Sequence, residues 1–111
     1  MAQPKQAEPQ RGQTDPIRGR IIRLTWTDGP TKGKTHEHTF HEDGTVDWGG
    51  KERAKYGAMR ASDEVYLMSY LAASGYTLTV ALNFGDRTVV GFASNATDWQ
   101  PVRGTLEVVG G

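Results

Sequence analysis

The segment EVYLMSYLAASGYTLTVALN (64–83) contains two runs rich in aromatic and β-branched residues, separated by small residues and a glycine. Runs of this kind, bounded by turn formers, predict strands. We expect one strand at 64–71, a turn at 72–75 and a second strand at 76–83. The segment therefore predicts an antiparallel β-hairpin.

The length of this turn sets which side chains face inward, because a shift of one residue reverses both faces of a strand. A three-residue turn at Ala73-Ser74-Gly75, with glycine in the left-handed conformation, pairs Tyr70 with Leu78 and places Tyr66, Met68 and Tyr70 inside. A four-residue turn would turn the other face inward, namely Val65, Leu67, Ser69 and Leu71. The Tyr-Met-Tyr stripe would then be exposed and would suggest a homodimer face.

A second hairpin is predicted at THEHTFH (35–41) and TVDWG (45–49), joined by Glu42-Asp43-Gly44. The same three-residue turn pairs Phe40 with Val46 and His38 with Trp48. Because Phe40 and Val46 are apolar, their face is expected inside. Alternation along the strand then brings in His36, His38 and Trp48.

Further strands are expected at 18–27, 88–94 and 104–109, whereas 50–63 reads as a short helical turn or an irregular strand, and 95–103 as a loop or short strand. Seven or eight short strands joined by tight turns predict an all-β, antiparallel up-and-down barrel of the lipocalin-like kind, since closure removes exposed sheet edges. A two-layer sandwich is the alternative.

The chain has 111 residues, no cysteine and a formal net charge of zero. This length favours one domain, which we place at 17–111, after a Pro- and Gln-rich leader at 1–16 that we expect to be disordered. A neutral chain lacks the strong field that holds nucleic acid or an anionic membrane, so neither is an expected partner. With no apolar segment long enough to span a bilayer, a cytoplasmic protein is expected.

The inward face of the predicted barrel is aromatic and holds two imidazoles, which suits a small aromatic or hydrophobic ligand. The expected ligand-binding residues are Trp26, His36, Phe40, Trp48, Tyr56, Met68 and Arg53. The alternative is that the aromatic rings simply fill the core. Although His36 and His38 share a strand face, no third ligand is evident, so we expect no metal. The sequence has neither GxxxxGK(S/T) nor GxGxxG after a strand, so we expect no other cofactor.

Three functions fit this pattern. The first is a cofactor-independent lyase, isomerase or cyclase in which His38, with Tyr70 or Tyr66, moves protons on a small aromatic or polyketide-like substrate. The second is a carrier that binds a small hydrophobic ligand without changing it. The third is an interaction module that forms a homodimer through an exposed aromatic stripe.

Three stretches resemble the MoaF-like domains: LTWTDG…FHEDGTVDW (24–48), SYLAASGYTLTVALN (69–83) and GFASNATDWQPVRGTLE (91–107). Together they extend over most of 18–109. The resemblance implies a lipocalin-like fold. It implies no defined chemistry.

A more distant resemblance is to phenolic acid decarboxylases, which are dimeric lipocalin-like barrels that act without a cofactor. WTDG (26–29) is similar to their Tyr-Glu-Asn-Gly segment, and VYLMSYLA (65–72) to the strand that supplies their catalytic acid. The chain differs from that family at the catalytic and carboxylate-binding positions. Leu24 and Trp26 stand where the family has carboxylate-binding tyrosines, and Ala72 where it has the glutamate, while the family's arginine corresponds loosely to Arg53 or Lys55.

Overall fold

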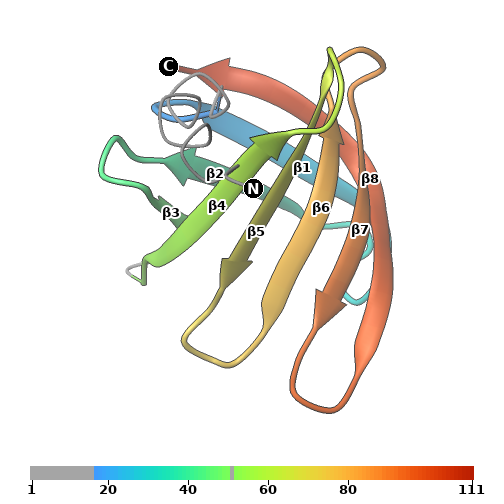
Figure 1. The fold of residues 1–111 in the computed structure, drawn as a ribbon. Coiled ribbons are helices and arrows are strands. Elements are labelled where there is room, and N and C mark those ends of the chain that lie inside the picture. Colours follow the sequence, from blue (N-terminus) through green and yellow to red (C-terminus); the bar gives the residue numbers. More distant parts are fainter. Residues whose placement is uncertain (1–16, 51) are drawn as a thin grey trace, which may run out of the picture.

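The computed structural model describes residues 17–50 and 52–111, so the leader expected at 1–16 lies outside the described residues. The described part is all β, and its strands are β1 (Ile21–Asp28), β2 (Thr35–Phe40), β3 (Thr45–Asp47), β4 (Ala54–Arg60), β5 (Val65–Leu71), β6 (Thr77–Asn83), β7 (Thr88–Ser94) and β8 (Trp99–Gly110). Each strand pairs antiparallel with the next, and β8 pairs with β1 to close the barrel (Figure 1). The predicted up-and-down barrel is confirmed, and the sandwich is excluded. No helix within the described ranges has the length and apolar character to cross a membrane.

The β5–β6 hairpin has the three-residue turn that its sequence predicts. The amide of Ala72 donates to the carbonyl of Tyr76 at 2.7 Å, and Gly75 has a φ of 95°. Tyr70 therefore lies opposite Leu78, and the four-residue alternative is wrong. The Tyr-Met-Tyr stripe faces the interior, which removes the exposed aromatic stripe on which the homodimer hypothesis depended.

The β2–β3 hairpin uses the same kind of turn. The amide of His41 donates to the carbonyl of Thr45 at 2.8 Å, Gly44 has a φ of 87°, and Phe40 pairs with Val46 as predicted. Because β3 ends at Asp47, Trp48 lies beyond the ladder, so the predicted backbone pairing of His38 with Trp48 is wrong. The rings of these two residues still approach, with centroids 6.3 Å apart.

Two segments that were ambiguous in sequence are strands. The first contains β4, which pairs with β3 at its start and with β5 from Tyr56 to Arg60, so the strand interpretation of 50–63 is correct and the helical turn is wrong. The second contains the start of β8 at Trp99. β1 pairs with β8 only as far as Arg103, so Pro101 lies in the part of β8 that projects past β1. A proline is tolerated there because its missing N–H has no partner to lose on that side.

One end of the barrel is solidly packed. Its fully buried side chains include Ile17, which comes from the segment before β1, together with Ile22, Phe40, Val46, Met68, Leu82 and Val89. The β5–β6 and β7–β8 turns lie at the lower end of the barrel in Figure 1. At that end, the interior holds a cavity.

Candidate functional site

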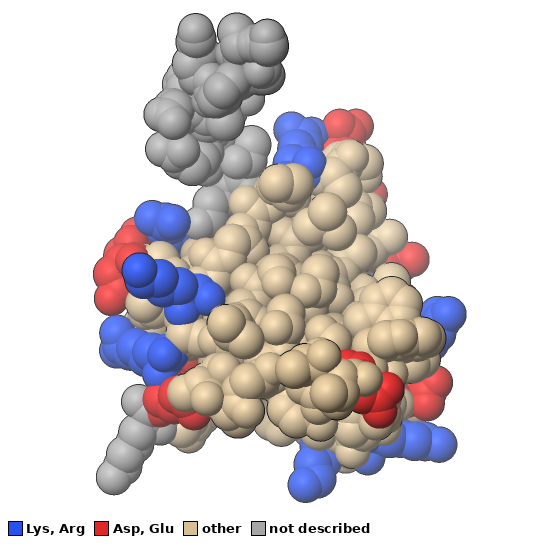
Figure 2. Space-filling model, turned by 60° about the horizontal axis from the view of Figure 1, so that its bottom comes forward, with Lys and Arg blue, Asp and Glu red and all other residues tan. Residues whose placement is uncertain are grey.

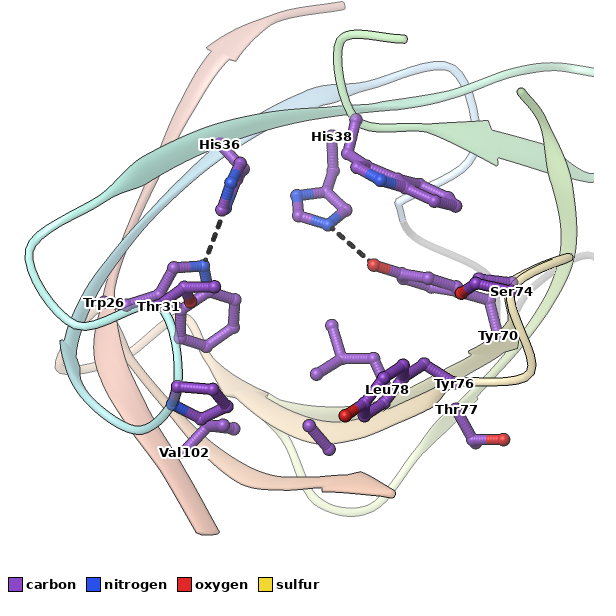
Figure 3. A pocket seen from close by; sticks show the side chains of 14 residues that line it. Trp26, Thr31, His36, His38, Tyr70, Ser74, Tyr76, Thr77, Leu78 and Val102 are labelled. Atoms are coloured by element: carbon purple, nitrogen blue, oxygen red, sulfur yellow. Dashed lines mark hydrogen bonds between the residues drawn. The ribbon is translucent and has the colours of Figure 1, made fainter. Parts of the chain in front are cut away.

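A cavity of about 410 Å³ occupies the end of the barrel at the β5–β6 turn (Figure 3). Five of the residues expected at the site line it, namely Trp26, His36, His38, Trp48 and Tyr70. The wall is completed by Pro30, Thr31, Ala72, Ser74, Tyr76, Thr77, Leu78, Ala93 and Val102. The volume lies within the range of small-molecule sites in proteins.

His38 and Tyr70 form a hydrogen-bonded pair in the cavity wall. Alternation along β2 turns His38 inward two residues before Phe40, and its Nε2 lies 3.3 Å from the hydroxyl of Tyr70. The ring of Trp48 stacks on Tyr70, with centroids 4.7 Å apart and planes 18° from parallel. The stacking holds the phenol of Tyr70 near the imidazole of His38. Figure 3 marks the hydrogen bond between these two residues with a dashed line.

Burial keeps this pair neutral. His38 is 2% exposed, and burial, with a smaller contribution from the charge of His36, lowers its pKa to about 4. The backbone of His36 and the charge of Asp47 act in the opposite direction but do not prevail. Burial also raises the pKa of Tyr70 well above its usual value. Near pH 7 the wall therefore presents an imidazole and a phenol, neither of them charged.

A second imidazole is fixed in one tautomer by Trp26. The indole Nε1 of Trp26 donates to Nδ1 of His36 at 3.0 Å. An indole N–H can only donate, so Nδ1 must be the acceptor, and a neutral ring then carries its proton on Nε2. Burial, and secondarily the charge of Lys34, lowers the pKa of His36. This ring therefore offers a ligand one hydrogen-bond donor of known position and no charge.

The remaining sequence-predicted residues do not line the cavity. Phe40 and Met68 belong to the packed core, and Tyr56 packs edge-on against Phe40 at 4.9 Å. Tyr66 contacts Phe84 with ring centroids 5.7 Å apart. Arg53 is exposed and pairs with Asp43 at 3.7 Å. The aromatic residues and Met68 do not reach the wall because they lie where the interior is filled, and Arg53 does not reach it because it lies on the outside.

Sequence reasoning missed much of the rim. Leu78 was recoverable, since the correct β5–β6 register already places it opposite Tyr70. No sequence pattern indicated Pro30 and Thr31. They belong to the β1–β2 loop, and they line the cavity because of the way that this loop folds. Ser74 and Tyr76 flank Gly75 in the β5–β6 turn. They line the cavity because the packed core does not extend to this end of the barrel.

The described residues that line the cavity include no Asp, Glu, Lys or Arg. Across residues 17–50 and 52–111, no group of three His, Cys, Asp or Glu side chains is placed to hold a metal ion. The cavity can therefore offer aromatic faces and neutral hydrogen-bonding groups, but no charged partner.

Comparison with known proteins gives a likeness in fold but no family. No family model matches the chain, and no curated protein matches it. A crystal structure described as a "putative beta-lactamase" from Burkholderia vietnamiensis superposes with a TM-score of 0.70, covering 85% of this chain and 96% of the other at 19% sequence identity. At that identity, the likeness shows a shared fold.

Proposed function

We propose that this protein binds a small, flat, uncharged molecule with an aromatic ring in the open end of its barrel. The observation that carries the proposal is a cavity of about 410 Å³ walled by Trp26, Trp48 and Tyr70, with two imidazoles that burial keeps neutral. Stacked and edge-on contacts with aromatic walls suit a planar ring.

The electrostatics select for a neutral ligand. A charged ligand would lose its hydration and meet no counter-charge on the described wall, which is unfavourable by several kcal/mol. A hydroxyl or carbonyl group would instead find the Nε2–H of His36 or the His38–Tyr70 pair. We therefore expect phenols and related neutral rings to bind better than aromatic acids.

The test compares 2-naphthol with its charged near-isostere 2-naphthoate by quenching of tryptophan fluorescence. We expect 2-naphthol to bind at least about tenfold more tightly, a factor that corresponds to about 1.4 kcal/mol. Leu78→Trp, which fills the cavity, should abolish binding. Leu71→Trp, at an exposed position on the adjacent strand, should leave it unchanged. Equal binding of both ligands, or binding that survives Leu78→Trp, would contradict the proposal.

Catalysis is the second candidate. It is favoured by the 3.3 Å contact between His38 and Tyr70, which would supply a base and an acid for a cofactor-independent lyase, isomerase or cyclase step. Acid–base catalysis works best when the pKa lies near the working pH, whereas burial moves these two pKa values away from neutrality in opposite directions. Binding is for this reason the better supported function. A chemically altered ligand recovered from the protein, with turnover lost in both His38→Ala and Tyr70→Phe, would reverse this order.

Membership of the MoaF-like domains is also a proposal, supported by the barrel that this resemblance implies. The decarboxylase resemblance gains no support at the cavity. Trp26 and Ala72, which stand at positions of that family's carboxylate-binding and acidic residues, are both in the wall. The indole N–H of Trp26 is already donated to His36, and the methyl group of Ala72 cannot transfer a proton.

Hydrolysis of a β-lactam is less well supported by this cavity. It needs an activated nucleophile or a metal-bound water. Ser74 lies in the β5–β6 turn at the rim, with no hydrogen bond to a base among the described residues, and the same part of the chain presents no three-ligand metal cluster. We expect no hydrolysis of the chromogenic β-lactam nitrocefin above the rate of a Ser74→Ala control.

A further inference from the structure

One ring nitrogen of His36 is left for a ligand. Nδ1 of His36 accepts from the indole of Trp26, whereas Nε2 has no hydrogen bond to any described residue and is not buried. The neighbouring imidazole, His38, has its Nε2 bonded to Tyr70 and its Nδ1 fully buried. Nε2 of His36 is therefore the imidazole nitrogen of the cavity wall that a ligand can bond directly.

The register of β1 and β2 places Trp26 where it can hold this ring. Leu24 lies opposite His36, so Trp26 is the diagonal neighbour of His36 on the inward face. Diagonal neighbours on paired strands are within reach of each other when their side chains are aromatic. The amide of Trp26 donates to the carbonyl of Lys34 at 2.9 Å, its carbonyl accepts from the amide of Gly33 at 2.8 Å, and its side chain is buried. The indole is therefore a firmly held donor.

The hydrogen bond from Trp26 sets both the tautomer and the orientation of His36. An indole N–H can only donate, so the proton of the neutral imidazole must lie on Nε2. The torsion that rotates an imidazole about its Cβ–Cγ bond has broad minima, so without a partner the ring would sample several directions. The bond from Trp26 removes this freedom. The cavity consequently gains a donor with a fixed direction.

A fixed, uncharged N–H in an aromatic wall favours a carbonyl group as its partner. A carbonyl oxygen only accepts, and it accepts best near the plane of the C=O group. In an aryl ketone or aldehyde this plane coincides with the plane of the aromatic ring, so the hydrogen bond does not disturb the fit of a flat ligand. A neutral ligand also suits the approach to the cavity. The surface viewed in Figure 2, with the lower end of Figure 1 brought forward, is largely uncharged and has most of its charged groups around its edge.

We propose that Trp26 is a positioning residue that makes the cavity selective for aryl ketones and aldehydes, because it holds the Nε2–H of His36 toward the ligand. Trp26 then has two roles, since its ring is also part of the wall. This inference rests on the proposed function, because an aromatic ring must occupy the cavity before its carbonyl group can meet His36.

The first test observes the hydrogen bond in the ligand-free protein by NMR. Long-range proton–nitrogen spectra show which nitrogen of His36 carries the proton, and a scalar coupling across the hydrogen bond connects Nε1 of Trp26 with Nδ1 of His36. Above the pKa of His36, we expect the proton on Nε2 and a measurable coupling. A proton on Nδ1, or the absence of the coupling, would overturn the proposal.

The second test compares 2-acetylnaphthalene with 2-isopropenylnaphthalene, which has nearly the same shape but a C=CH2 group in place of the carbonyl. Binding is measured by calorimetry as displacement of 2-naphthol. We expect the ketone to bind about fivefold more tightly than the alkene, as one hydrogen bond implies. Trp26→Phe keeps an aromatic ring but loses the N–H, and should lower this preference to about twofold. His36→Leu removes the donor itself and should abolish the preference.

Trp48→Phe is the matched control, because Trp48 is also a tryptophan of the wall but its ring stacks on Tyr70. This variant should weaken both ligands to the same degree and leave the preference for the ketone unchanged. Melting curves will establish that each variant is folded. If Trp26→Phe does not fold, His36→Leu and the NMR measurement still test the proposal.

The outcomes separate the two proposals. If 2-naphthol binds but the ketone and the alkene bind equally, the role of Trp26 is overturned and the cavity proposal stands. The same holds if Trp26→Phe weakens both ligands to the same degree, or if the preference survives His36→Leu. If none of the three compounds binds, the proposed function fails and the selectivity fails with it.

Discussion

His38 lines the cavity and also affects the stability of the folded protein. It is the one polar residue among the fully buried side chains that the structure describes, and its Nδ1 has no hydrogen-bond partner among them. Nε2 is held by Tyr70, so the ring is oriented but only half satisfied. A buried unsatisfied polar atom lowers stability by about 1–3 kcal/mol. Because its burial lowers stability, His38 is a candidate for a functional role.

The depressed pKa of His38 predicts a specific pH dependence of stability. The pKa falls from 6.5 in the unfolded chain to about 4 in the folded protein. The unfolded state therefore takes up a proton first, and stability falls as the pH drops from 6.5, levelling off near 4. The size of the effect is about 3 kcal/mol. Urea unfolding at several pH values should show this loss, and His38→Gln should remove most of it, leaving the contribution of His36, whose pKa burial also lowers.

His41 provides the control, because it is only part-buried, whereas His38 is fully buried, and it bonds Asp47 at 2.6 Å. His41→Gln should keep the loss of stability between pH 6.5 and 4. If the free energy of unfolding depends on pH in the same way in His38→Gln as in the parent chain, other groups cause the pH dependence.

Among the structural elements, the two short hairpins fix the register of the site. Both use a three-residue turn that ends in a glycine with positive φ, at Gly44 and Gly75. The first turn directs His38 inward and the second directs Tyr70 inward, so two turns far apart in sequence bring the pair together. An error of one residue in either turn would send one member of the pair to the outer surface.

Because Gly75 ends the β5–β6 turn with a positive φ, we expect Gly75→Ala to destabilise the protein through backbone conformation alone. An added Cβ would meet nothing within 4 Å, but the φ of 95° is unfavourable for alanine. The expected loss is about 1–2 kcal/mol. Gly57→Ala is the control, since a Cβ there also has free space and no positive φ is required. Thermal unfolding of both variants tests the prediction, and equal melting temperatures would refute it.

In the whole molecule, function depends on an interior that is packed at one end and hollow at the other. The β1–β8 seam holds this interior closed, with backbone pairing from Ile21 to Asp28. On its outer surface, Arg23 bonds Glu37 at 2.8 Å and Glu107 at 3.1 Å. Exposed ion pairs contribute little, so the ladder and the core must hold the seam.

Removal of residues 105–111 should therefore abolish cooperative unfolding, because it deletes the β8 partners of β1 from Ile21 to Thr25 and the buried Leu106. Arg23→Gln, which removes the ion pairs and leaves the ladder, should unfold with nearly the same midpoint as the parent chain. Circular dichroism with heating measures both. A truncated chain that still unfolds cooperatively would contradict the importance of closure.

The barrel, both hairpin registers and the inward aromatic face follow from the amino-acid sequence, because alternation and turn chemistry act over neighbouring residues. That local information identified Trp26, His36, His38, Trp48 and Tyr70 as wall residues. It could not separate them from Phe40, Tyr56, Tyr66 and Met68, which share the same face or the same strands. Which of them meet open space depends on where Ile17 and the core fill the barrel and where the β1–β2 loop brings in Pro30 and Thr31. That division arises from packing between strands far apart in the chain, and so it appears first in the folded molecule.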